Sequence, residues 1–121
     1  MLFRSSATPV YGVRMGRLGF LAESTEPEAE AGLAAILDGG GRIEERVMLR
    51  ATVEGVGDVP PFDALNDVVI GGEHLGRTVS VGLRVDGVLL AEYRADAVIA
   101  ATATGSTGYA LAVGGPILHP T

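Results

Sequence analysis

The chain has 121 residues, of which 47% are hydrophobic, and its formal net charge is −6. This length suits about one domain, and the apolar fraction is too high for a disordered chain. An acidic chain without a basic run is a poor partner for nucleic acid or an anionic membrane, and a chain without cysteine forms neither a disulfide nor a thiolate metal site.

The first residues, MLFRSSATP, lack the long apolar core of a signal peptide. No apolar run in the sequence approaches the roughly 18 residues that a membrane span needs. We therefore predict a cytoplasmic protein.

Residues 9–41 have the pattern of a strand, a glycine-rich loop and a helix. PVYGV (9–13) predicts a short buried strand, and RMGRLGF (14–20) a loop that lets the backbone approach a ligand. Ser24 or Thr25 is suited to cap the next helix, which has Pro27 in its first turn and three glycines at 39–41 as its stop. These elements predict the closing piece of an α/β unit over residues 1–41.

From residue 42 onward the pattern changes to antiparallel β structure. Residues 45–54 alternate polar and apolar side chains, as a half-buried strand does, and residues 55–61 predict a loop. Asp86-Gly87 is a strong signal for a two-residue hairpin turn. Further strands are predicted over 64–70, 78–85 and 88–95. The expected fold class is α+β, with the end of an α/β unit at 1–41 and part of an antiparallel, β-rich domain at 42–121.

The segment from Asp96 to Pro120, DAVIAATATGSTGYALAVGGPILHP, carries the clearest chemical signal. An apolar strand (97–101) leads into TATGSTGY, which brings hydroxyls and free backbone N–H groups to one point. A small-residue helix and a Gly-Gly-Pro stop follow. Such a loop suits a polar, phosphate-bearing ligand, although part of the pattern also fits a plain Ser/Thr cap on a packed helix.

Three blocks of the sequence resemble the NAD kinase family, in the family's order. GVRMGRLGFLAE (12–23) is similar to GVNxGxLGFLxE, and ALNDVVI (64–70) to the Asn-Glu motif, with Asp67 in place of glutamate. The segment 96–120 is similar to GDG, TPTGSTAY and GGPI in succession. The departures are mild: arginine at 14 for asparagine, alanine at 103 for proline, glycine at 108 for alanine, and alanines at 95 and 97 for glycines.

The family's GGDG motif, whose aspartate is the proposed general base, does not occur in this sequence. We therefore expect a central fragment of an NAD kinase-like fold, without the catalytic aspartate and the C-terminal end. Such a fragment is expected to be inactive alone.

The resemblance implies transfer of a phosphoryl group from ATP, or from polyphosphate, to the 2′-hydroxyl of the adenosine ribose of NAD, giving NADP. This chemistry depends on positioning and on Mg²⁺ to neutralise the phosphates. NAD and ATP are thus the implied partners, and a homodimer or homotetramer the implied assembly of the full-length protein. No metal ligand is expected in this chain.

Asn66 and Asp67 are the first pair that the resemblance assigns to NAD, and their donors and acceptors suit a diol or a base edge. An isolated Asn-Asp would instead indicate a β-turn. The resemblance also places Arg94 and Asp96 at the ligand, Asp96 at its nicotinamide half, although an acid in that place is more often a strand-end residue. Arg77 is either another ligand-facing residue or a solvated arginine.

The turn at 104–109 and the helix after it supply the other contacts with NAD that the resemblance implies: Thr107, Gly108, Tyr109, Ala110, Leu111 and Ala112. The adenine is expected near Thr107 and Tyr109, with Phe20 and Ser106 as candidate members of its pocket. Phe20 is alternatively a core residue, and His119 is expected to be structural.

Two other classes of protein stay open. One is a non-catalytic module that binds NAD or NADP. The other is a relative of the diacylglycerol and sphingosine lipid kinases, which share the broader fold. The Asn66-Asp67 and TGSTGY motifs match the NAD kinases better than the lipid kinases.

Overall fold

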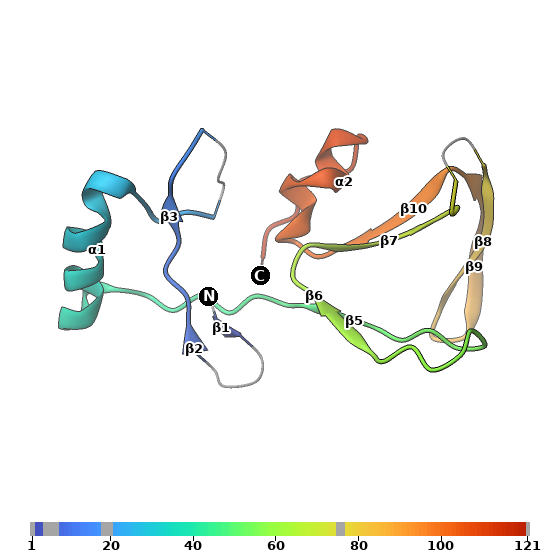
Figure 1. Ribbon diagram of the computed structural model, residues 1–121, viewed down its shortest axis with the longest axis horizontal. Coiled ribbons are helices and arrows are strands. Elements are labelled where there is room, and N and C mark those ends of the chain that lie inside the picture. Colours follow the sequence, from blue (N-terminus) through green and yellow to red (C-terminus); the bar gives the residue numbers. More distant parts are fainter. Residues whose placement is uncertain (1, 4–7, 18–20, 75–76, 121) are drawn as a thin grey trace. The chain divides into compact units, whose positions relative to one another are not determined.

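Two units divide the chain in its computed structural model, Met1–Arg46 and Val47–Thr121, and each is described by itself (Figure 1). The structure describes residues 2–3, 8–17, 21–74 and 77–120. In that part of the chain, no helix combines the length and the apolar character that crossing a bilayer requires.

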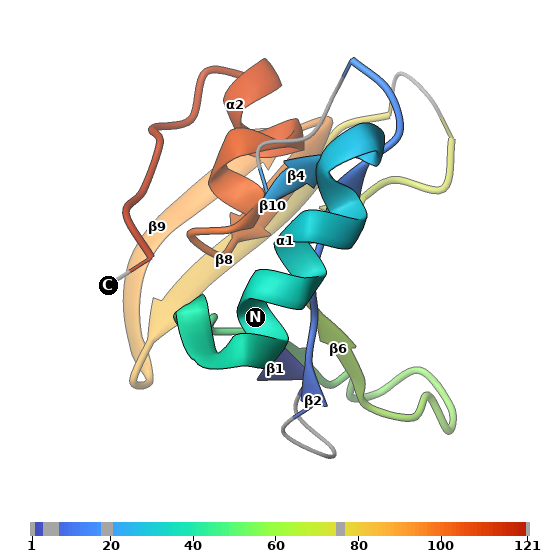
Figure 2. The same ribbon diagram turned by 90° about the vertical axis from the view of Figure 1, so that its left-hand side faces the viewer.

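The described residues of the first unit form two small pairs of strands and one helical segment. Strand β1 (Leu2–Phe3) is antiparallel to β2 (Thr8–Pro9), and β3 (Val13–Arg14) is parallel to β4 (Ser24–Thr25). The helical segment follows β4 directly and is drawn along its length in Figure 2. It begins as a 3₁₀ turn (Glu26–Glu28), continues as α1 (Ala29–Ala35) and ends in a wider turn (Ile36–Gly40).

Both ends of this helical segment follow the expected chemistry. Thr25 is the N-cap, and its backbone N–H and its hydroxyl both donate to Oε2 of Glu28, at 3.0 and 2.6 Å. At the other end, Gly39 has a φ of 85°, a left-handed conformation that glycine adopts at low cost. The predicted cap and stop are therefore confirmed.

The predicted strand over residues 9–13 is not continuous, because β2 ends at Pro9 and β3 begins at Val13. The backbone between them is bound to Glu23 instead. The N–H of Gly12 donates to Glu23 Oε2 at 2.7 Å, and the carbonyl of Gly12 accepts from the N–H of Glu23 at 3.0 Å.

A glycine in the middle of α1 allows the helix to lie close to this segment. A Cβ atom added to Gly32 would lie 2.0 Å from the hydroxyl oxygen of Tyr11. Glycine normally weakens a helix interior by roughly 0.5–1 kcal/mol relative to alanine. At this position the close approach of Tyr11 explains its presence.

In the second unit, the described residues form three antiparallel pairs of strands and a short helix. Strand β5 (Leu49–Ala51) pairs with β6 (Phe62–Ala64), β7 (Asp67–Gly71) with β10 (Ala97–Ala101), and β8 (Val79–Val85) with β9 (Val88–Ala95). A 3₁₀ turn (Gly105–Thr107) and helix α2 (Tyr109–Ala112) follow β10. The fold class is α+β, as predicted.

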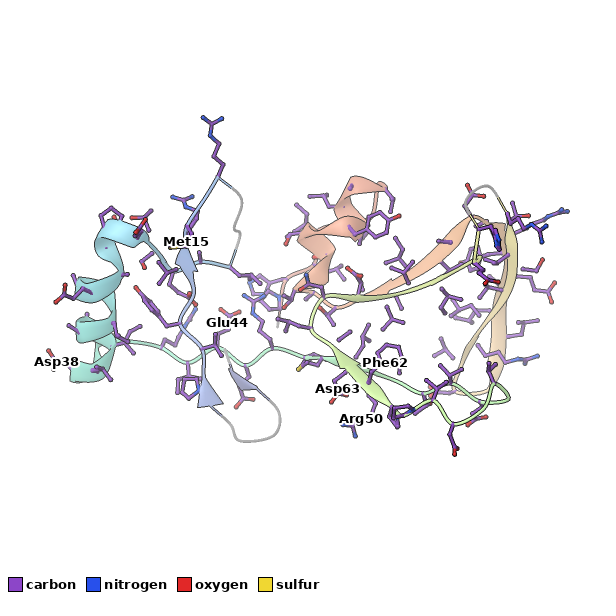
Figure 3. The ribbon with its side chains drawn as sticks, viewed as in Figure 1. Met15, Asp38, Glu44, Arg50, Phe62 and Asp63 are labelled. Carbon is purple, nitrogen blue, oxygen red and sulfur yellow. The ribbon has the colours of Figure 1, made fainter. Side chains whose placement is uncertain are left out.

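Local sequence signals account for the hairpin and for the β5–β6 pair. Asp86 and Gly87 both have positive φ, 50° and 81°, as a type I′ turn requires. On β5 and β6, Arg50 binds Asp63 through two hydrogen bonds, Nε to Oδ1 at 2.8 Å and a terminal nitrogen to Oδ2 at 2.9 Å (Figure 3). This bidentate pair fixes the register in which Arg50 lies opposite Asp63.

Two predicted strands of the second unit differ from the observed ones. The alternating pattern over 45–54 forms a strand only at Leu49–Ala51, where β6 supplies a partner. The predicted strand over 64–70 is divided into β6 and β7 by a bend at Leu65 and Asn66. Both carbonyls of the bend bind Thr102 instead of a neighbouring strand.

The most buried side chains of the described residues are polar. Thr102, Thr104 and Ser106 are 6%, 4% and 1% exposed, while no hydrophobic side chain in the described ranges is fully buried. Val68, Val98 and Ile99 on β7 and β10 are half-buried. The tightest packing therefore lies in the hydroxyl-rich loop after β10.

The Glu28 cap gives the helical segment a dependence on pH. The hydrogen bonds from the Thr25 hydroxyl and N–H lower the pKa of Glu28 below its ordinary value. A carboxyl group whose pKa is lowered by folding stabilises the folded state at pH values above its unfolded pKa of about 4.3. This stabilisation is lost as the pH falls through the folded pKa.

We predict that Glu28→Gln makes the backbone chemical shifts of 26–35 less sensitive to acid. Glu30→Gln, in the same first turn, is the control, and an equal acid response in all three proteins would contradict the prediction.

Candidate functional site

Thr102, the residue after β10, connects the hydroxyl-rich loop to the bend between β6 and β7. Its backbone N–H donates to the carbonyl of Asn66 at 2.8 Å, and its hydroxyl donates to the carbonyl of Leu65 at 2.6 Å. The same hydroxyl accepts from the N–H of Gly105 at 3.0 Å, and the carbonyl of Thr102 accepts from the N–H of Ser106 at 2.9 Å. One buried threonine thus orders both segments.

Gly105 brings the loop against the backbone of Asn66. A Cβ atom at this position would lie 2.0 Å from the carbonyl oxygen of Asn66 and 2.4 Å from its carbonyl carbon. Both are backbone atoms, so a side chain at 105 cannot be accommodated by a rotamer change. The contact places the Asn66-Asp67 motif beside the TATGSTGY loop.

Ser106 connects the loop to the segment that follows α2. Its hydroxyl donates to the carbonyl of Ala103 at 2.6 Å and accepts from the N–H of Leu118 at 3.0 Å. Thr104 differs from its neighbours, because its buried Oγ1 has no hydrogen-bond partner among the described residues. Thr107 donates from its hydroxyl to the carbonyl of Thr104 at 3.3 Å.

A cleft of about 720 Å³ lies between β10 and the segment after α2. This volume falls in the usual range for small-molecule and cofactor sites. Among the described residues of the lining, Asp96 is the one that carries a charge. Tyr109, 52% exposed, supplies an accessible aromatic ring. The other lining residues are Ala97, Ile99, Ala101, Ser106, Ala110, Val113, Gly114, Gly115, Pro116 and Leu118.

The chemistry of the cleft suits a ligand with a flat ring and with hydroxyl or amide donors. A carboxylate accepts hydrogen bonds from such donors, and a half-exposed tyrosine ring offers a face for stacking. Most of the lining is apolar, which is typical of cofactor sites with few polar groups.

The structure brings several of the predicted site residues together. Asp96, Ser106, Tyr109 and Ala110 line the cleft. Asn66 lies beside the loop through its backbone, and Asp67 lies opposite Ala101 at the start of the β7–β10 pair. The remaining predicted residues of the turn and α2 belong to the same short segment without lining the cleft: Thr107, Gly108, Leu111 and Ala112.

Other predicted residues lie elsewhere. Arg94 on β9 lines a separate hollow of about 420 Å³, formed with β8 residues such as Ser80. The N–H of Arg77 donates to the carbonyl of His74 at 3.3 Å in the turn before β8. Phe20 lies outside the described residues. The roles of these three residues stay predictions.

Thr102 is the residue that sequence reasoning missed. The pattern placed it inside a hydroxyl-rich loop but gave no reason to single it out. Its position as the first residue after an apolar strand is a signal, because a hydroxyl at a strand end can bind backbone groups of a neighbouring segment. In the wall of the cleft, Gly114, Gly115 and Pro116 were expected as a helix stop and as part of the GGPI match, and Leu118 was not singled out.

Comparison with known proteins finds similarity to NAD kinases. Residues 65–121 match the family of the ATP-NAD kinase C-terminal domain. The NAD kinase of Chloroherpeton thalassium is 46% identical over 117 residues, which are 96% of this chain and 41% of that protein. The NAD kinase of Geobacter metallireducens is 47% identical over 113 residues, 93% of this chain and 40% of that protein.

This chain is similar to NAD kinases over almost its whole length. Two solved structures of NAD(H) kinases share its fold. The yeast NADH kinase in complex with NADH has a TM-score of 0.80 at 26% identity, over 93% of this chain and 33% of that one. An NAD kinase from Archaeoglobus fulgidus in complex with ATP has a TM-score of 0.74 at 34% identity, over 93% of this chain and 43% of that one. The chain spans about two fifths of the length of the curated NAD kinases.

The role of Thr102 can be tested by removing its hydroxyl alone. Thr102→Val leaves the carbonyl of Leu65 and the N–H of Gly105 without this partner in a buried site, so we expect a loss of about 1–3 kcal/mol in the free energy of unfolding. Thr102→Ser keeps the hydroxyl and is expected to lose less. Chemical denaturation of the three proteins compares these values, and equal losses for valine and serine would contradict the role of the hydroxyl.

Gly105 and Gly108 form a matched pair for the close approach to Asn66. A Cβ atom at 105 meets backbone at 2.0 Å, whereas at 108 the nearest atoms are the carbonyl oxygen of Gly105 at 3.3 Å and Nδ2 of Asn66 at 4.0 Å. We expect Gly105→Ala to cost about 3 kcal/mol or more and Gly108→Ala about 1 kcal/mol or less. Thermal unfolding measures the difference. A Gly105→Ala protein as stable as Gly108→Ala would contradict the observed packing.

Proposed function

We propose that this chain forms the NAD-binding part of an NAD kinase, an enzyme that transfers a phosphoryl group from ATP or polyphosphate to the 2′-hydroxyl of the adenosine ribose of NAD. The observation that carries the proposal is the cleft beside the TATGSTGY loop. Contacts of Thr102 and Gly105 with Asn66 hold the Asn66-Asp67 motif against this loop. The relatives named NAD kinase support it, as do the related structures with NADH and with ATP.

Phosphoryl transfer to one of two neighbouring ribose hydroxyls needs the acceptor in a single register. We propose that Asn66 and Asp67 bind the adenosine half of NAD and that Asp96 accepts hydrogen bonds from the nicotinamide half. Tyr109 then offers its ring for stacking in the same cleft. A rigid backbone contact at Gly105 serves such positioning, since small displacements of the acceptor are costly in rate.

Mg²⁺ is proposed to enter with the phosphoryl donor, whose oxygens are its preferred ligands. Within the described ranges, no group of three or more His, Cys, Asp or Glu side chains is placed to hold a metal ion. When bound, Mg²⁺ supplies charge neutralisation of the phosphates. The cytoplasmic location and the assembly into a dimer or tetramer stay predictions.

The sequence contains no GGDG motif, so we propose that this chain by itself binds NAD without phosphorylating it. In that respect the chain alone would behave as the non-catalytic binding module considered above. A lipid kinase is less favoured, because the relatives and structures described above are NAD or NADH kinases.

We predict that calorimetric titration of the chain with NAD detects binding and that Asp96→Asn weakens it at least about tenfold, since a hydrogen bond to a charged group contributes roughly 1.5–3 kcal/mol. Asp86→Asn is the matched control, because Asn-Gly forms the same hairpin turn. Incubation with ATP, Mg²⁺ and NAD is expected to yield no NADP. Formation of NADP would overturn the proposed inactivity, and absence of binding would overturn the site.

A further inference from the structure

The wall of the cleft that faces β10 is a segment without helix or strand. It follows α2 and contributes Gly114, Gly115, Pro116 and Leu118 to the lining. The opposite wall belongs to β10 and to Asp96 just before it. The width of the cleft therefore depends on how the irregular wall is held.

The near end of this wall is fixed by the last turn of α2. The N–H of Gly114 donates to the carbonyl of Leu111 at 3.0 Å, and the N–H of Gly115 donates to the carbonyl of Ala110 at 2.8 Å. Gly114 has a φ of 93°, which favours glycine. Backbone geometry alone sets this end.

The far end is held by a side chain twelve residues earlier, since the N–H of Leu118 donates to the hydroxyl of Ser106 at 3.0 Å. The same hydroxyl donates its proton to the carbonyl of Ala103 at 2.6 Å, so its oxygen accepts the hydrogen bond from Leu118 through a lone pair. Ser106 is 1% exposed, which keeps water from competing for this bond. Its donor and one acceptor position are both occupied within the protein.

We propose that Ser106 is a positioning residue, which sets the width of the cleft by holding the Pro116–Leu118 wall against the loop. Ser106 acts through Leu118 instead of contacting the ligand with its hydroxyl. The inference rests on the proposed function in taking NAD as the ligand. The role predicted for Ser106 thus changes from a member of the adenine pocket to the acceptor of the Leu118–Ser106 hydrogen bond, which we call the strap.

The first test removes the acceptor with Ser106→Ala. We expect amide hydrogen exchange at Leu118 to become on the order of tenfold faster and the dissociation constant of NAD to rise by a similar factor. Exchange in the β8–β9 hairpin should stay unchanged. Thr52→Ala, at an exposed residue outside both hollows, is the control, with wild-type exchange at Leu118 and wild-type affinity for NAD.

The second test removes the donor with Leu118→Pro, which lacks a backbone N–H. This variant is expected to weaken NAD binding at least as much as Ser106→Ala, because it also replaces a side chain that lines the cleft. The double variant is expected to bind no more weakly than Leu118→Pro, because both changes break one bond. Additive losses in the double variant would overturn the strap, as would unchanged exchange at Leu118 in Ser106→Ala.

The outcomes for the strap and for the proposed function are distinguishable. If the wild-type chain binds NAD and Ser106→Ala binds it equally well, the strap is overturned and the proposed function stands. If the wild-type chain does not bind NAD while exchange at Leu118 still rises in Ser106→Ala, the bond holds the wall and NAD is the wrong ligand.

Discussion

The hydroxyl of Thr102 is the interaction on which the rest of the site depends. It donates to the bend at Leu65 and accepts from the loop at Gly105, so two segments far apart in sequence share one oxygen atom. The backbone of Thr102 adds a bond on each side, to Asn66 and to Ser106. Since Ser106 in turn holds Leu118, the cleft, its irregular wall and the Asn-Asp motif form one hydrogen-bonded network. Such networks give a defined geometry only when their members are satisfied together.

This site is organised by polar groups to an unusual degree for so apolar a chain. The buried side chains of the described residues are hydroxyls, while residues such as Leu90 and Val88 on β9 are 62% and 63% exposed. A hydrogen bond has a direction, and a hydrophobic contact does not. A network of hydroxyls and close glycine contacts can therefore place a loop more precisely than apolar packing of the same size.

Features set by neighbouring residues could be predicted from the sequence, and features set by distant ones could not. Asp86-Gly87, the cap at Thr25 and the stop at Gly39 each depend on conformational preferences of a few adjacent residues. The bend at Leu65 and Asn66 depends instead on Thr102, and the interruption after Pro9 depends on Glu23. For the site, the motif at 104–109 was recognisable, whereas its closing wall needed the Ser106–Leu118 contact.

The order of strands along the chain has a consequence for how the site comes into being during folding. Strands β7 and β10 pair with each other, and the β8–β9 hairpin lies between them in sequence. A hairpin with a two-residue turn closes from local contacts within microseconds, while a long loop is closed against its chain entropy. Once β8 and β9 are paired, most of the residues that separate β7 from β10 are already ordered. With the Asp86-Gly87 turn closed, the loop that separates Thr102 from Leu65 is effectively shorter, so a hairpin outside the cleft lowers the entropy cost of forming it.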